Sequence, residues 1–178
     1  MTVAVTIREP QSIVEYRASI RVIADAWRAG FADIVNEAAF DHMDRLANNS
    51  ESASHYALYR SHEGMALRVA CLDEAVIGVG SVIWAADQTK EFVDQTSAEI
   101  RTLYVHPAQW RAGIGSDLLD TLCELPPRRF DRVVLETFTA NSDGRSFYRS
   151  NGFTPTGKTT FSIAGSTYQT VIFEKQLR

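Results

Sequence analysis

Two glycines separated by a single residue lie between an apolar run and a helical pattern in this chain. Pro107 follows the apolar residues Leu103–Val105 and prevents further strand pairing. Gly113 and Gly115 stand where the helical repeat then begins. Glycine lets a backbone approach a ligand closely, and the first amides of a helix have no partner within it. The junction therefore predicts a binding site for phosphate oxygens, with a simple tight turn as the alternative.

Two familiar phosphate loops do not fit these residues. A P-loop needs a lysine directly after its second glycine, and no lysine follows Gly115. The dinucleotide fingerprint needs a third glycine three residues after Gly115, where this chain has Leu118. The predicted phosphate site is therefore of another type.

Cysteine and histidine form no reactive constellation. Cys71 and Cys123 lie in apolar runs with no histidine placed beside them, so we expect reduced, packed thiols and no covalent thiol mechanism. The histidines have no metal-ligand spacing, and no metal site is predicted. They are His42, His55, His62 and His106.

The elements that must position the glycine junction follow from hydrophobic periodicity. Period-2 stretches predict strands at Val3–Arg8 and at residues 65–72, 75–86, 98–105, 130–138, 153–163 and 167–177. Helical spacing predicts helices at residues 13–30, Phe31–Leu46, 48–60, 114–125 and 142–150. Residues 1–178 show no repeat or linker, so this order predicts one α+β domain with helices on both faces of a mixed sheet.

The glycine junction resembles the acetyl-CoA loop of the GNAT-type N-acetyltransferase family. That loop reads Leu-Tyr-Val-x-Pro, then Arg or Gln, then Gly-x-Gly, and this chain departs from it with Trp110 at the Arg or Gln position. A second stretch resembles the family's next strand–helix unit, and residues 1–35 resemble its opening less closely. The matching residues are Leu103, Tyr104, Val105, Pro107, Gly113 and Gly115, followed by Asn141, Phe147, Tyr148, Gly152 and Phe153.

The resemblance implies a mostly antiparallel sheet of about seven strands and a coenzyme cleft. Strands Glu99–Val105 and Arg132–Phe138 are then splayed, and acetyl-CoA lies between them as a cosubstrate. Backbone groups of Leu103, Tyr104 and Val105 pair with the pantetheine amides, and the side chain of Asn141 touches the same arm. The pyrophosphate binds the amides of Arg111, Ala112, Gly113, Ile114, Gly115 and Ser116.

The resemblance also implies acetyl transfer to a primary amine by direct attack. A free alkyl ammonium has a pKa of about 10, so a base must remove its proton. Glu99 is the candidate base, with a solvated strand-start residue as the alternative, and a water chain could carry the proton. Tyr148 is the candidate acid for the leaving thiolate, with a core aromatic as the alternative. The carbonyl oxygen needs a donor, which a strand amide near Val105 could supply.

Aromatic and acidic residues in the first half of the chain suggest an acceptor side for a small-molecule or peptide amine. Trp27 and Phe31 are the principal candidate walls, with Tyr56, Tyr59 and Trp84 as further ones. An acidic stretch at residues 31–51 could attract a cationic amine, and the alternative, the solvated face of amphipathic helices, is the more common explanation of such a stretch.

Composition limits the remaining functions. The net charge of −4 disfavours a nucleic-acid binder, and no apolar run is long enough to span a membrane. We expect a soluble, cytoplasmic protein, which could form a homodimer as many relatives do. Two alternatives to an enzyme stay open: a non-catalytic acyl-CoA-binding or sensor domain of the same fold, and an unrelated interaction domain whose glycine loop is only a turn.

Overall fold

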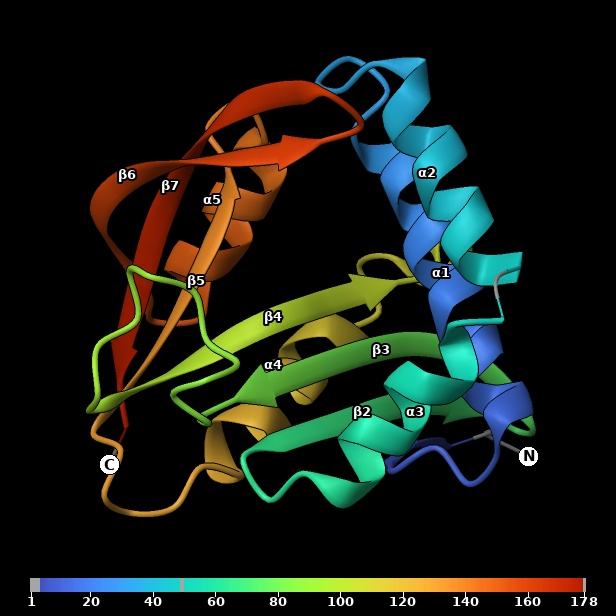
Figure 1. Cartoon of the computed structure of the whole chain (residues 1–178), viewed down its shortest axis with the longest axis horizontal. Coiled ribbons are helices and arrows are strands. Elements are labelled where there is room, and N and C mark those ends of the chain that lie inside the picture. The colour runs from blue at the N-terminus through green and yellow to red at the C-terminus, as the bar shows by residue number, and fades with distance from the viewer. Residues whose placement is uncertain (1–3, 49, 178) are drawn as a thin grey trace.

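One seven-stranded sheet organises the chain in this computed structural model, which describes residues 4–48 and 50–177 (Figure 1). The strands are β1 Val5–Arg8, β2 Met65–Leu72, β3 Ala75–Ile83, β4 Ser97–Val105, β5 Arg132–Phe138, β6 Thr154–Ile163 and β7 Ser166–Gln176. The helices are α1 Ile13–Gly30, α2 Glu37–Asn48, α3 Ser52–Ser61, α4 Ile114–Glu124 and α5 Ser142–Ser150, with a short 3-10 turn at Pro107–Gln109. The predicted mixed α+β architecture is confirmed.

The sheet order is β1-β2-β3-β4-β5-β7-β6, and every neighbouring pair is antiparallel except β4 with β5. The parallel pair is short, because only Ser97, Ala98 and Glu99 of β4 align with β5. Beyond Glu99 and Val134 the two strands diverge, as Figure 1 shows. We call the paired end of this gap the closed end and the end near Val105 the open end.

Helices cover both faces of the sheet. Helices α1 and α3 pack on one face, and α4 packs on the opposite face against β2, β3 and β4 (Figure 1). Two glycines of β3 leave room for α4, because a Cβ on Gly80 would lie 2.6 Å from Leu122 and one on Gly78 would lie 3.0 Å from Leu118. The glycines therefore let α4 approach the sheet closely.

The second helix begins later than its pattern predicts. Residues 31–36 form a turn, in which the amides of Ile34 and Val35 donate to the carbonyl of Phe31. The Asn36 side chain then accepts from the Ala39 amide at 3.2 Å, which caps α2. The predicted helix over residues 31–46 therefore starts too early. The prediction was wrong because the apolar residues of the turn continue the helical spacing of α2. Val3, the predicted start of the first strand, lies outside the described residues.

The turn before α2 also bridges the two halves of the sheet. The Asn36 amide donates to the Tyr168 hydroxyl at 3.1 Å, and its side chain donates to Ser166 Oγ at 2.8 Å. Both partners belong to β7, whereas α1 packs on β3 and β4. The diverging strands are therefore connected across the open end. None of the described helices is long and apolar enough to cross a membrane.

Candidate active site

A cleft of about 1070 Å³ follows the gap between β4 and β5. Its walls come from α1, β4, the loop before α4, β5, α5 and β6. Most of the sequence-predicted site residues line it, whereas Ala112, Tyr56, Tyr59 and Trp84 do not. Those that line it are Trp27, Phe31, Glu99, Leu103, Tyr104, Val105, Arg111, Gly113, Ile114, Gly115, Ser116, Asn141 and Tyr148.

The loop at the open end has an unusual backbone. Arg111 has φ 64° and Gly113 has φ 85°, so two left-handed residues alternate before α4 begins at Ile114. Glycine adopts this conformation without steric cost, and arginine does not. A Cβ on Gly113 would meet no atom within 4 Å, so the space beside that residue is open. The conformation, and not crowding, explains the glycine at this position.

The amides of this loop have no partner in the described part of the chain. None of the backbone N–H groups of residues 111–116 donates a hydrogen bond there, and the first helical bond runs from Asp117 to the Gly113 carbonyl at 3.1 Å. Alternating left-handed residues followed by a helix N-terminus aim such amides at one point. The arrangement suits an anion with several oxygens.

Trp110 ties this loop to its surroundings. Its indole Nε1 donates to the Val105 carbonyl at 2.7 Å, and a Cβ on Gly30 would lie 3.7 Å from the ring. The ring is 46% exposed and lies between the ends of β4 and α1. Where the family motif has Arg or Gln, this chain therefore has a side chain that anchors the loop.

The backbone of β4 offers hydrogen-bonding groups to the gap at alternate residues. The His106 amide donates to Ile77 of the β3 side at 2.8 Å, and Tyr104 is aligned with Val79. Since neighbouring residues of a strand direct their backbone groups to opposite sides, those of Tyr104 face β3 while those of Leu103 and Val105 face the gap. The backbone groups of Tyr104 are therefore not available to a ligand in the gap, and only its side chain faces the cleft.

A β-bulge at Arg101 interrupts the alternation of side chains along β4. Ser81 is aligned with Thr102, but the next residue, Val82, is aligned with Ile100. The extra residue reverses the alternation, as bulges near active sites often do. Glu99 and Tyr104 therefore lie in different phases of the alternation, and all of residues 99–105 line the cleft.

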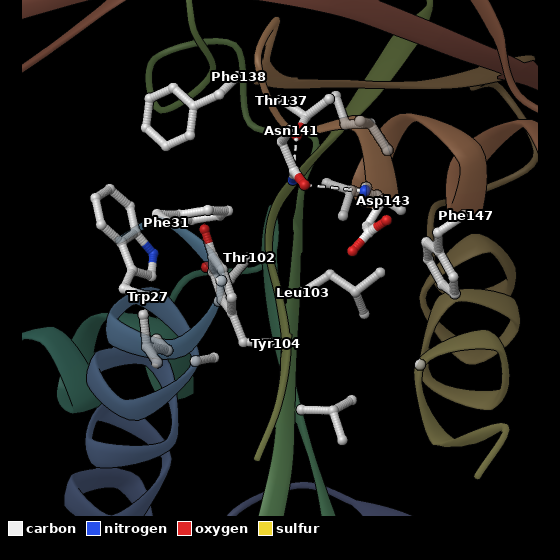
Figure 2. A pocket seen from close by; sticks show the side chains of 18 of the residues that line it. Trp27, Phe31, Thr102, Leu103, Tyr104, Thr137, Phe138, Asn141, Asp143 and Phe147 are labelled. Atoms are coloured by element: carbon white, nitrogen blue, oxygen red, sulfur yellow. Dashed lines mark hydrogen bonds between the residues drawn. The ribbon is translucent and has the colours of Figure 1, made fainter. Parts of the chain in front are cut away.

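The cleft extends to both sides of β4, and we call these two parts the first and the second chamber. In Figure 2, Trp27, Phe31 and Tyr104 gather on one side of β4, while Leu103 points toward Phe147 on the other. On the first side the rings of Trp27 and Phe31 are 5.1 Å apart and nearly perpendicular. Burial raises the pKa of Tyr104 to about 12, so this phenol stays protonated at neutral pH.

Asn141 caps α5 at the edge of the second chamber. Its side-chain oxygen accepts from the Gly144 amide at 3.0 Å, and its Nδ2 donates to Thr137 Oγ1 at 3.1 Å (Figure 2). An amide nitrogen carries two protons, so one donor remains for a ligand. The predicted contact with the pantetheine arm is compatible with the capping role.

Tyr148 lies half-buried on α5, beside the gap. Its ring packs against Phe147 at 5.3 Å and against Phe153 and Phe173, each at 5.9 Å. Burial raises the pKa of this phenol well above its usual value, and the nearby phenol of Tyr104 adds to the shift. Tyr148 is therefore a protonated hydroxyl on the cleft wall that can donate a proton.

Glu99 is a buried and fully engaged carboxylate at the closed end. It is 2% exposed, and both of its oxygens accept from Arg101, at 2.6 and 2.7 Å. The backbone amide of Lys90 donates to it as well, at 3.0 Å. It is therefore a buried residue and not the solvated strand-start residue that the sequence left open.

A second carboxylate, missed by the sequence reasoning, lies two residues beyond the closed end on β5. Glu136 accepts from Thr170 Oγ1 at 2.7 Å and forms an ion pair with the Lys90 ammonium. That ammonium also lies 5.1 Å from the centre of the Phe161 ring. The sequence did contain a signal for this site, because Glu136 is a charged residue within the otherwise mostly apolar strand pattern of residues 133–138.

Other sequence-predicted features do not join the cleft. Tyr56, Tyr59 and Trp84 are absent from its lining, and Tyr56 stacks on Tyr16 with ring centres 5.3 Å apart. These three residues therefore do not form walls of this cleft. Among the described residues, no group of three or more His, Cys, Asp or Glu side chains could hold a metal ion.

Solved structures with the same fold include three acetyltransferases. The PaiA N-acetyltransferase of Thermoplasma acidophilum, in complex with coenzyme A, is 23% identical with a TM-score of 0.76, covering 97% of this chain and 99% of that one. A ribosomal-protein-alanine N-acetyltransferase from Brucella melitensis is 22% identical, with a TM-score of 0.72 and coverage of 97% and 99%. YncA from Salmonella typhimurium, with its cofactor acetyl-CoA, is 21% identical, with a TM-score of 0.70 and coverage of 98% and 95%.

These identities show a shared fold. A search of curated protein sequences found no match. The model of the acetyltransferase (GNAT) family matches residues 31–153, more than half of the chain. The chain therefore belongs to the GNAT acetyltransferase family.

Proposed function

We propose that this protein transfers the acetyl group of acetyl-CoA to a primary amine by direct attack. The observation that carries the proposal is the row of unpartnered amides at residues 111–116, at the open end of a cleft that continues between β4 and β5. Diphosphate oxygens suit those amides, and an extended arm suits the gap.

The pantetheine arm runs along β4 from the open end to the closed end. It forms hydrogen bonds with the backbone of Leu103 and with the amide of Val105, whose carbonyl is already occupied by Trp110. Asn141 supplies its remaining amide proton to the same arm. The thioester then lies near the closed end.

The amine approaches from the chamber of Trp27 and Phe31. Glu99 takes its proton through a water, because both carboxylate oxygens already accept hydrogen bonds from Arg101. A gap-facing amide of β4 on the closed-end side of Val105 stabilises the carbonyl oxygen as charge develops on it, because Val105 itself lies at the open end. The nitrogen–carbon bond forms as the carbon–sulfur bond breaks.

Tyr148 protonates the departing thiolate. Its raised pKa keeps the phenol protonated, and its ring contacts with Phe147, Phe153 and Phe173 hold its orientation. A correctly oriented acid is worth about 10²–10⁴-fold in rate.

Calorimetry with acetyl-CoA, followed by thiol release with a panel of alkyl, aromatic and peptide amines, tests the proposal. We expect saturable binding, and thiol release that depends on the amine. No binding heat at any accessible concentration would contradict the proposed coenzyme site.

A non-catalytic acyl-CoA sensor is the second candidate. The observation that favours it is that both carboxylates at the closed end are engaged, Glu99 by Arg101 and Glu136 by Lys90. A sensor binds acetyl-CoA but releases no thiol with any amine, so the same panel distinguishes the two functions.

A further inference from the structure

Lys90 is the lysine of this chain that reaches into the cleft. The sequence has three lysines, Lys90, Lys158 and Lys175, and among them only Lys90 belongs to the described cleft lining. It lies on the segment between β3 and β4, which passes close to β5 in Figure 1. Its ammonium is a primary amine, the group that the proposed reaction acetylates.

We propose that Lys90 Nζ is itself acetylated by the coenzyme bound in the same molecule. This inference rests on the proposed function. Two features support it: the side chain ends at the closed end of the gap, and it is held there by the groups that an acceptor ammonium needs.

The position of Nζ follows from the strand register. Glu136, its ion-pair partner, is two residues beyond Val134, the last residue of β5 aligned with β4. At about 3.3 Å per residue, β4 covers about 20 Å between Glu99 and Val105. A coenzyme with its diphosphate at residues 111–116 extends along that length, so its acyl end points toward the region that Nζ occupies.

Lys90 is fixed at both ends of its side chain. Its backbone amide donates to Glu99 Oε2 at 3.0 Å, and its ammonium contacts the Glu136 carboxylate and the face of the Phe161 ring. Such anchoring reduces the entropy that a flexible lysine loses on reaching a reactive geometry. The side chain is 30% exposed, so water can enter and carry a proton away.

The chemical step balances without another reactant. Nζ loses one proton to Glu136 or to water, and its lone pair attacks the thioester carbon. The nitrogen–carbon bond forms, the carbon–sulfur bond breaks, and the thiolate takes up one proton to leave as the free thiol. The products are Nε-acetyl-lysine at position 90 and coenzyme A.

Lys175 provides a matched control within the same molecule. Its ammonium also has a carboxylate and an aromatic ring beside it, with Asp120 at 4.0 Å and Phe153 at 5.7 Å. It does not line the cleft, and neither does the exposed Lys158. Chemical acetylation in free solution does not depend on the cleft, so these two lysines report the background.

The test incubates the full chain with acetyl-CoA and no added amine, and follows intact mass and peptide maps with time. We expect one acetyl group on Lys90, added at least about tenfold faster than on Lys158 or Lys175. The rate per molecule should not change with protein concentration, and Lys90→Arg should stay unmodified. Tyr148→Phe should slow modification of Lys90 and leave that of Lys175 unchanged.

Three results would overturn the inference. A parallel assay with the amine panel shows whether the proposed function fails as well. If Lys90 is modified no faster than Lys175 while added amines release thiol, self-acetylation is wrong and the proposed function stands. If neither Lys90 nor any amine is acetylated by bound acetyl-CoA, both are wrong. A rate per molecule that rises with protein concentration means transfer between molecules and rejects the intramolecular step.

Discussion

Tyr148 is the residue that we propose as the acid for the leaving thiolate, and it packs against the core at the edge of the cleft. Its hydroxyl is protonated at neutral pH, as any tyrosine hydroxyl is, burial raises its pKa further, and the side chain lines the cleft. We expect Tyr148→Phe to lower kcat by about 10- to 1000-fold, with little change in the dissociation constant of acetyl-CoA. Steady-state kinetics and calorimetry on the variant measure the two effects separately.

Tyr168→Phe is the matched control for that substitution. It also removes one phenol hydroxyl, which accepts from the Asn36 amide at 3.1 Å, but Tyr168 does not line the cleft. We expect its kcat to remain within about twofold of the unmodified enzyme, since its hydroxyl does not reach the reacting atoms. If Tyr148→Phe behaves in the same way, Tyr148 has no part in proton transfer.

Residues that a local motif carries line the cleft, whereas contacts between distant segments have no such local signal. Gly113, Asn141 and Tyr148 stand at fixed places in two linked motifs, and all three line the cleft. The pair of Lys90 and Glu136 could not be predicted, because its members are 46 residues apart. Their contact depends on the register of β4 with β5, which no local pattern specifies.

At the scale of elements, the loop before α4 allows a prediction about coenzyme affinity. Gly113 has φ 85° and open space where a Cβ would lie, so alanine there costs about 1–2 kcal/mol of backbone strain. If the loop relaxes to relieve that strain, its amides no longer converge. We expect Gly113→Ala to weaken acetyl-CoA binding about tenfold, the equivalent of about 1.4 kcal/mol, as measured by calorimetry.

Gly165 offers a closely matched control for Gly113. It has φ 79° and likewise no atom within 4 Å of the position that a Cβ would take, but it lies in the turn between β6 and β7. Gly165→Ala should lose similar stability and keep its affinity for acetyl-CoA. Equal losses of affinity in the two variants would mean that the loop before α4 has no special role in binding.

The packing of α4 on the sheet supports a second prediction at this scale. A Cβ on Gly80 would lie 2.6 Å from the Cδ1 methyl of Leu122, whose side chain is fully buried and would have to shift within the packed core. We expect Gly80→Ala to reduce the free energy of unfolding by about 1–3 kcal/mol, measured by urea denaturation. Gly157→Ala is the control, because its Cβ would lie at an ordinary 3.6 Å from Ile172. A smaller loss for Gly80→Ala than for the control contradicts this account.

Element boundaries were predicted well where the chain itself marks them. The short helix at 142–150 ends before Gly152, whose φ is 86°, and agrees with its prediction. The start of α2 was missed because the Asn36 cap depends on a turn whose apolar residues continue the helical spacing. The left-handed conformation of Arg111 was also beyond prediction, since arginine does not favour it.

At the scale of the whole molecule, the order of elements predicted the architecture and tertiary contacts completed it. The alternation of periods along the chain was enough for a mixed sheet with helices on both faces. The divergence of β4 and β5 was predicted only from the resemblance to the family. The periodicity of a strand does not specify which strand it pairs with. The contacts of Asn36 with β7, which connect the two halves of the sheet, were not foreseen for the same reason.

Two tyrosines and a cysteine whose pKa values are raised in the folded protein predict how the stability of the whole molecule depends on pH. Burial raises the pKa of Tyr16 and Tyr104 to about 12 and that of Cys123 to about 11. In the unfolded chain these groups ionise near their ordinary values, about 10 for tyrosine and 8.5 for cysteine. Between those values and the folded-state pKa, the unfolded chain has lost protons that the folded protein keeps. Stability is therefore unaffected by these groups below about pH 8.5 and falls as pH rises toward 12.

Tyr16→Phe isolates one part of this effect, because Tyr16 lies among core residues away from the cleft. A pKa difference of about two units corresponds to about 2 kcal/mol, developed between pH 10 and 12. We expect the free energy of unfolding of the unmodified protein to fall more steeply over that range than that of the variant, by urea denaturation at a series of pH values. Phenylalanine has no proton to lose, so the two curves should be parallel below pH 9 and diverge above pH 10. Curves that remain parallel to pH 12 would mean that Tyr16 ionises in the folded protein as easily as in the unfolded chain, which its burial argues against.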